Sequence, residues 1–560
     1  MWRRSLALTE TDSAGVDPVV LGVIWQKLVT LVDEVAQTFL RTCFSTVVRE
    51  NYDFACAIFD LEGRLLAQST YSIPSFIGTM PVTLRAMLDK FPPHTMAPGD
   101  VVISNNPWLG PGHLNDITMC CPVFRGGRLV AYMGSISHSV DIGGAPSHAS
   151  RDVLEEGLCI PVLKIVEGGR ENGAVIDFIA ENVRVPKDTL GDLRAQFGAY
   201  GVGVRKVGEL LGENRLEDLQ SVAREIMSRS ERAMRRRIAE IPDGRWSGEA
   251  VADGYDSPLT IRGSVEVAGS DIYIDYHGTA PQFDRPVNSV LNFTRAYTAY
   301  AVKCALDPTL PNNDGCFRPV HVEAPAGSIL NPEPPAPVWA RHLTGHYLPF
   351  VVFAALSRAI PDRVCAESGS PLWSVYFKGK DYRGKRFVTI FFMNGGHGAR
   401  PGKDGPNCLS FPSNVSNTPI EIVENSIPVL VREKELVSGS GGPGKFRGGC
   451  GQQISFEVLA EEPLTMTIRH ERVKNPPRGM LGGRPGMPGL ELVDGRAIPP
   501  KTQMQLSKGD VVTFRTPGGG GFLPPEDRDP GAVAADLRSG LVLPETATPA
   551  GSAMAEKEMA

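Results

Sequence analysis

The chain has 560 residues, of which 42% are apolar and 21% are charged, and its formal net charge is −6 at pH 7. This composition is typical of a large globular protein with two to four domains. The acidic balance argues against nucleic acid as the main partner. The chain contains no stretch of 18 apolar residues, so no membrane span is predicted. The ten cysteines show no CxxC spacing, and residues 1–13 lack an apolar signal core, so we expect reduced thiols and a cytoplasmic protein.

The first predicted element is a long helix near the N-terminus. It begins at Asp17-Pro18, a favourable N-cap followed by a proline in the first turn. Its apolar residues recur at three- and four-residue spacing: Leu21, Trp25, Leu28, Val32, Val35 and Phe39. A mixed pattern of strands and helices follows, and we predict an N-terminal mixed α/β domain over residues 1–185.

The rest of the chain divides by its periodicity. Amphipathic helices are predicted at 189–211 and 216–241, within a helical segment over residues 186–243. Strands at 259–267 and 272–276 open a central α+β domain over residues 244–420. Short strands with dense glycine predict a β-rich C-terminal domain over residues 421–524, and the Ala-, Pro-, Glu- and Ser-rich residues 525–560 predict a flexible tail. The expected fold class is therefore α+β, multidomain.

A predicted β-hairpin in the N-terminal domain carries the clearest sign of chemistry. Its strands are joined by Arg125-Gly126-Gly127-Arg128, and a Gly-Gly pair favours a tight turn. The spacing His-x-x-Asp flanks this hairpin twice, as His113/Asp116 and His138/Asp141. Imidazole and carboxylate groups at one end of a hairpin could together bind Mn²⁺, Zn²⁺ or Fe²⁺. A structural histidine beside turn aspartates explains the spacing equally well.

The register of the hairpin decides whether these groups can meet. If Arg125 pairs with Arg128, Asp116 lies opposite Ser137, and His138 then faces the other side of the sheet from Asp116. A β-bulge, or a departure from the sheet at residues 141–144, is needed to bring the two side chains together.

Other candidates are more isolated in the sequence. Glu50 and Asp53 precede a predicted strand and could complete an oxygen-rich metal shell, although a solvated pair fits as well. His397 lies in a glycine loop without apolar neighbours, a common setting for substrate-binding or acid–base histidines, and is the candidate catalytic residue. His342 and His346 are spaced for one helical face, but no third ligand is evident, so packing or capping is favoured there.

Two glycine-rich motifs could be mistaken for nucleotide sites. Residues 439–446 nearly match a P-loop, but Phe446 stands where a Ser or Thr should hold Mg²⁺, and the glycines that follow cannot begin a stable helix. Residues 518–521 are better explained as an irregular loop in which backbones approach closely. The sequence thus offers no ATP-binding loop.

Collinear motifs along the chain resemble the hydantoinase B/oxoprolinase family. The most telling are residues 105–116, N-N-P-W-L-G-P-G-H-L-N-D, and residues 137–144, S-H-S-V-D-I-G-G. Further matches extend from about residue 18 to 524, at 53–68, 182–186, 190–196, 275–282, 398–402, 417–421, 438–442 and 516–521. Family members often carry a second histidine where this chain has Ser139, so that position is not counted as a ligand.

The resemblance implies a subunit of an enzyme complex. It implies a B-type subunit of an ATP-dependent hydrolase that opens cyclic amides such as hydantoin, 5-oxoproline or a lactam. ATP would be used by a separate A-type subunit in a hetero-oligomer, and this chain would hold one divalent metal through Asp116, His138, His113, Asp141 and Glu50. Two alternatives remain open: a subunit of an ATP-dependent, biotin-independent ketone carboxylase, and a non-catalytic scaffold subunit.

Overall fold

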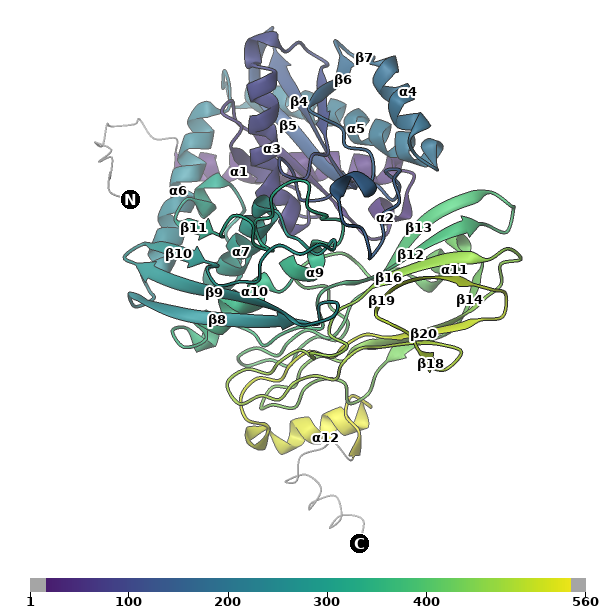
Figure 1. Ribbon diagram of the computed structural model, residues 1–560. Helices are drawn as coiled ribbons and strands as arrows, with labels where there is room; N and C mark the ends of the chain where they lie inside the picture. The colour runs from purple at the N-terminus through teal and green to yellow at the C-terminus, as the bar shows by residue number, and fades with distance from the viewer. Residues whose placement is uncertain (1–16, 545–560) are drawn as a thin grey trace.

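An antiparallel sheet in the N-terminal half holds the predicted hairpin. The computed structural model describes residues 17–544, and its fold is mixed α and β, as expected (Figure 1). The strands of the first sheet lie in the order β2-β1-β5-β4-β3-β6-β7. They comprise β1 (Phe54–Phe59), β2 (Leu65–Gln68), β3 (Val101–Ser104), β4 (Asp116–Arg125), β5 (Arg128–His138), β6 (Leu163–Glu167) and β7 (Arg170–Glu171). β4 and β5 thus form the predicted hairpin in the middle of this sheet.

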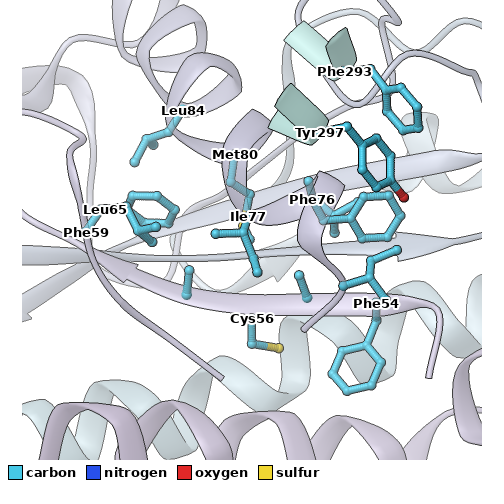
Figure 2. Close-up of a cluster of buried hydrophobic side chains, with 14 of the residues drawn as sticks. Phe54, Cys56, Phe59, Leu65, Phe76, Ile77, Met80, Leu84, Phe293 and Tyr297 are labelled. Atoms are coloured by element: carbon cyan, nitrogen blue, oxygen red, sulfur yellow. The ribbon is translucent and has the colours of Figure 1, made fainter. Parts of the chain in front are cut away.

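Helices cover both faces of the first sheet. On one face lies α1 (Pro18–Thr42), whose N-cap Asp17 accepts hydrogen bonds from Val19 and Val20 as expected, together with α5 (Pro186–Glu213). On the other face lies α3 (Pro74–Lys90), which packs against α7 (Leu291–Leu306). Figure 2 shows Phe54 and Cys56 of β1 pointing away from α3. Burial on both faces explains why every residue of β1 is buried.

The central part of the chain adds a second sheet and further helices. α6 (Gln220–Ile238) begins later than predicted, where the Asp218 carboxylate accepts a hydrogen bond from the Gln220 backbone. The second sheet has the order β11-β10-β9-β8. It comprises β8 (Gly244–Ala252), β9 (Leu259–Ala268), β10 (Asp271–Asp275) and β11 (Val320–Glu323), and α10 (Leu348–Leu356) packs on it. Shorter helices are α2 (Thr46–Arg49), α4 (Gly173–Glu181), α8 (Asp314–Phe317) and α9 (His342–Gly345).

Two more sheets form the β-rich C-terminal part. One has the order β13-β12-β16-β19, from β12 (Trp373–Lys380), β13 (Arg386–Met393), β16 (Leu464–Arg469) and β19 (Lys501–Leu506). The other has the order β14-β15-β20-β17-β18, from β14 (Val429–Leu436), β15 (Gln452–Val458), β17 (Leu490–Val493), β18 (Arg496–Ala497) and β20 (Val511–Arg515). β12 and β13 precede residue 421, yet they belong to the same sheet as β16 and β19. The C-terminal part therefore begins earlier in the chain than the predicted boundary, which falls at α11 (Ile420–Ser426).

Extended glycine-rich segments cross beneath these sheets and hydrogen-bond to one another (Figure 1). The Gly449 N–H donates to His397 O at 2.8 Å, and the Gly519 N–H donates to Gly449 O at 2.9 Å. A Cβ at any of several of these glycines would overlap a backbone carbonyl of the next segment. Close backbone approach, as expected at residues 518–521, therefore extends to a whole layer, which we call the glycine layer (residues 394–398, 439–451, 479–486 and 516–522). A P-loop is followed by a helix, whereas residues 439–451 contain none.

Residues 525–544 are ordered by a helix, which makes the expected flexible tail wrong over this stretch. α12 (Pro530–Arg538) is capped by Asp529, and its Asp536 pairs with Arg528 at 2.6 Å and Arg447 at 3.3 Å. The remainder of that tail, and the N-terminal segment 1–13, lie outside the described residues. Within residues 17–544, no helix has both the length and the apolar character needed to cross a membrane.

Candidate metal centre

A bulge in the β4–β5 hairpin brings the candidate ligands onto one face of the sheet. Arg125 pairs with Arg128 as expected, but the register shifts between Val123 and Phe124, because Val123 lies opposite Ala131 and Phe124 opposite Leu129. The extra residue in β5 moves every later pair by one position, so Asp116 lies opposite His138 rather than Ser137. The parity problem in the sequence is thereby resolved.

His113, Asp116 and His138 form a buried cluster at the open end of this hairpin. His113 Nε2 lies 2.6 Å from Asp116 Oδ1, and His138 Nδ1 lies 3.1 Å from the same oxygen. One ligand atom from each residue can be chosen so that all three lie within 4.8 Å of one another. Asp53, the residue before β1, adds a carboxylate oxygen 3.8 Å from His138 Nδ1.

Arg341 holds the cluster from the side of α9. Its Nη2 donates to Asp116 Oδ2, its Nε donates to Pro111 O, and its guanidinium stacks 4.3 Å from the centroid of the Phe293 ring. Burial by itself would raise the pKa of Asp116, but Arg341 and the neighbouring histidines outweigh burial and hold that pKa well below its usual range. Burial together with Arg341 lowers the pKa of His113 to about 3. Asp116 is therefore an anion beside a neutral imidazole.

The protonation of His113 favours a cation in the cluster. Its Nδ1 lies 3.1 Å from the carbonyl oxygen of Trp339, which can only accept, so Nδ1 carries the proton and Nε2 presents a lone pair. That lone pair faces the Asp116 carboxylate, and Nε2 makes no hydrogen bond within the described residues. Two acceptors this close are stable only with a proton or a metal cation between them. The Nε2 atom of His138 is also buried without a partner among those residues, and this set of nitrogen and oxygen donors suits Zn²⁺, Mn²⁺ or Fe²⁺.

The cluster lines a small cavity of about 60 Å³. One wall is apolar and comes from Phe76 of α3 with Phe293 and Tyr297 of α7, which lie together in Figure 2. Further apolar side chains also line it, and between them lie polar or charged groups: Asp53, Ser75, Arg341, His342, His346, Ser374, Tyr376 and Arg469. Convergent polar groups among apolar walls are a feature of ligand sites, but this cavity is much smaller than the roughly 300–1,000 Å³ of a site that encloses a whole small molecule.

The structure separates the remaining sequence candidates from this cluster. The Asp141 carboxylate accepts hydrogen bonds from Gly143 and Val185 N–H and from Arg184, so it holds a loop together. Glu50 pairs with Arg49 at 2.8 Å. His397 lies in the glycine layer, where Nδ1 donates to Gly398 O at 2.6 Å, and it does not line the cavity.

Replacing Asp141 with asparagine should therefore lower stability and leave metal binding intact. The carboxylate accepts several charge-assisted bonds, so we expect a loss of roughly 2–3 kcal/mol in the free energy of unfolding. Chemical denaturation and elemental analysis of the same preparation measure both quantities. A drop in bound metal without a drop in stability would instead place Asp141 among the ligands.

Comparison with known proteins matches residues 17–525 to the family described as hydantoinase B/oxoprolinase. The chain belongs to the hydantoinase B/oxoprolinase family. The resemblance inferred from the sequence motifs is thus confirmed. Within this family, the chain is 31% identical to the B-type subunit of a putative D-/L-hydantoinase from a Pseudomonas species, over 96% of this chain and 95% of that protein.

Two solved structures share the fold of this family member. The ATP-dependent caprolactamase of Pseudomonas jessenii aligns with a TM-score of 0.87 and 28% identity, over 95% of each chain. An acetone carboxylase aligns with a TM-score of 0.85 over 97% of this chain and 83% of that chain, and its 19% identity shows likeness of fold alone. The chain is also 30% identical to the 5-oxoprolinase of Dictyostelium discoideum but covers only 41% of that longer protein.

Local sequence patterns did not reveal every residue of the site. Arg341 and Arg469 lie far along the chain from the hairpin and reach the cavity only through the fold. His342 and His346 do share one wall, as their spacing indicated, with ring centroids 5.6 Å apart. His346 accepts a hydrogen bond from the Leu372 N–H and lies 3.1 Å from Tyr297 Oη, which agrees with the packing role favoured for it.

Proposed function

We propose that this chain is the B-type subunit of an ATP-dependent amidohydrolase that opens a cyclic amide such as a hydantoin, 5-oxoproline or a lactam. The observation that supports this most is the buried His113–Asp116–His138 cluster. It is held in a chain that aligns end to end with relatives named as the B-type subunit of a hydantoinase and the beta subunit of a caprolactamase. A carboxylate between two imidazoles that line a cavity suits hydrolysis better than a purely structural role.

The residues of the site would divide the work among them. His113, Asp116 and His138 would hold one divalent ion, which supplies Lewis acidity to the reacting carbonyl or water. Trp339 O fixes the His113 tautomer, and Arg341 fixes the Asp116 carboxylate, as residues around metal ligands commonly do. Asp53 lies 3.8 Å from His138 Nδ1 and would accept a proton from the attacking water.

ATP would act on a separate A-type subunit, which would phosphorylate the amide oxygen before this chain completes ring opening. The nearly P-loop motif at residues 439–446 lies in the glycine layer rather than before a helix. The 5-oxoprolinase relative contains more than half its length beyond the region that this chain matches, which is room for such a function in one polypeptide. We therefore propose a hetero-oligomer with an A-type partner.

The isolated chain should show no ATP-dependent ring opening, and activity should appear on mixing with the A-type subunit. The reason is that substrate activation and hydrolysis would reside on different chains. Phosphate release is to be followed with hydantoin, 5-oxoproline and caprolactam in turn, using the partner alone as the control. Ring opening by this chain alone would contradict the division of labour.

An ATP-dependent ketone carboxylase is the second candidate function, because the acetone carboxylase structure shares the fold. ATP turnover by the assembled complex that requires acetone and bicarbonate, and does not respond to cyclic amides, would favour it. A purified chain that holds no metal would favour a scaffold role.

A further inference from the structure

Arg469, the last residue of β16, is a buried cation that forms no direct ion pair in the part of the chain that the structure describes, although Glu156 lies close enough to feel its charge. The residue is 2% exposed and lines the same cavity as the His113–Asp116–His138 cluster. Its Nη2 contacts Tyr376 Oη at 3.3 Å, while Nε and Nη1 have no hydrogen-bond partner within residues 17–544. The groups that act most on its charge within that described range are Tyr376, Tyr255 and Arg341, and none of them is a carboxylate.

Other buried arginines nearby are paired, which makes Arg469 different. Arg472, three residues along the chain, donates to the Glu367 carboxylate at 2.7 Å. Arg341 donates to the Asp116 carboxylate. Burial of an unpaired charge is costly, and groups of this kind are normally paired or bind an ion. Burial accordingly lowers the pKa of Arg469.

Aromatic rings fix the Arg469 guanidinium in place. Its central carbon lies 3.6 Å from the centroid of the Trp339 ring and 4.6 Å from that of Tyr376. Cation–π contacts offset part of the desolvation cost, but they leave the edge of the guanidinium free to donate. Tyr376 and Trp339 also line a second groove, of about 310 Å³.

Further unpaired polar atoms belong to the same cavity. His342 Nε2 and Ser374 Oγ are buried without partners among the described residues, and both residues line it. Its volume of about 60 Å³ is enough for on the order of four water-sized groups. The cavity therefore combines a positive guanidinium edge, neighbouring polar atoms and space for a small polyoxygen group.

We propose that Arg469 binds an oxyanion, either a phosphoryl group or a carboxylate, beside the metal cluster. This deepens the proposed function, on which it rests. Water would add to the phosphorylated amide carbon, and the ring C–N bond would break as the nitrogen takes the proton from the added hydroxyl. A second water would then hydrolyse the resulting acyl phosphate to a carboxylate and inorganic phosphate, both of which are oxyanions. A guanidinium offers parallel N–H donors that match either group. Arg469 is thus the residue that positions the anionic part of the substrate or product relative to the cluster.

The test is calorimetric titration of the purified, metal-loaded full chain with inorganic phosphate in one arm and acetate in the other. The wild-type chain should bind one anion. Tighter binding of phosphate would identify the ligand as a phosphoryl group, and tighter binding of acetate would identify it as a carboxylate. Arg469→Gln should weaken that binding at least tenfold, and Arg469→Lys should retain part of it. Arg472→Lys is the matched control, since Glu367 already pairs with that buried arginine, and should bind as the wild type does.

Metal content measured on the same samples separates this proposal from the proposed function. Unchanged metal with lost anion binding in Arg469→Gln supports the oxyanion site, even if the chain proves to act on another substrate. Equal affinity in Arg469→Gln and wild type, or no binding of either anion by wild type, overturns it. Should both Arg469 variants fail to fold, crystals of the wild-type chain soaked in selenate decide: an anomalous peak beside the guanidinium supports the proposal, and none refutes it.

Discussion

Replacing His138 with alanine is expected to abolish ring opening by the assembled complex and to reduce bound metal to a small fraction of one ion per chain. His138 brings one of the cluster's two imidazoles to Asp116. Even changes around metal ligands cost roughly 10–100-fold in metal affinity, and loss of a ligand costs more. Elemental analysis after dialysis, paired with an ATP-dependent ring-opening assay, measures both effects.

His346→Gln is the control for this experiment, because His346 lines the same cavity outside the cluster. Its metal content should equal that of the wild type. Equal metal in His138→Ala and wild type would remove this cluster from the mechanism. Asp116→Ala should also lose metal, and it should unfold more easily because it leaves Arg341 buried without its anion.

Replacing Gly449 with alanine is expected to prevent folding of the C-terminal part or to destabilise it by more than about 4 kcal/mol. A Cβ there would overlap Pro406 O, while the Gly449 backbone is hydrogen-bonded on both sides, to His397 and Gly519. The obstacle is backbone, which cannot rotate away as a side chain can. Urea denaturation of the purified variant, or its loss to the insoluble fraction, reports the effect.

Gly198→Ala supplies the matched control, because it is the same substitution in the exposed middle of α5 with nothing within 4 Å of the new Cβ. Removing a glycine from a helix should stabilise the chain by up to about 1 kcal/mol. Similar stability in the two variants would show that the glycine layer tolerates side chains.

The sequence predicted which residues could form the cluster, but it did not predict the hairpin register that brings them together. The strands and the Arg125–Arg128 turn followed from local residues, but no local pattern indicated the bulge between Val123 and Phe124. His138-x-x-Asp141 repeats the spacing of His113-x-x-Asp116, yet β5 ends at His138 and the chain turns away, so Asp141 binds the loop at Arg184. Equal spacing does not give equal direction once a strand ends.

Long-range contacts account for what the sequence could not predict in the site. Arg341 lies 225 positions from its partner Asp116, and no periodic pattern connects them. A shorter-range signal was available elsewhere, since Asp529-Pro530 is the same N-cap and first-turn pair as Asp17-Pro18 and begins α12 within the stretch expected to be flexible. The prediction of a flexible tail relied on the Ala-, Pro-, Glu- and Ser-rich composition of residues 525–560 and did not use this N-cap signal.

The glycine layer separates evolutionary constraint from chemistry. Where backbones touch directly, every amino acid other than glycine is too large, so selection on packing alone would keep these positions fixed across homologues. A mutational scan should then show Gly449 and Gly519 to be as intolerant as Asp116, although neither glycine contacts the cavity. If these glycine motifs are invariant, the cause would be backbone packing and not catalysis. A search for catalytic residues based on invariance alone would then select the glycine layer instead of the cavity.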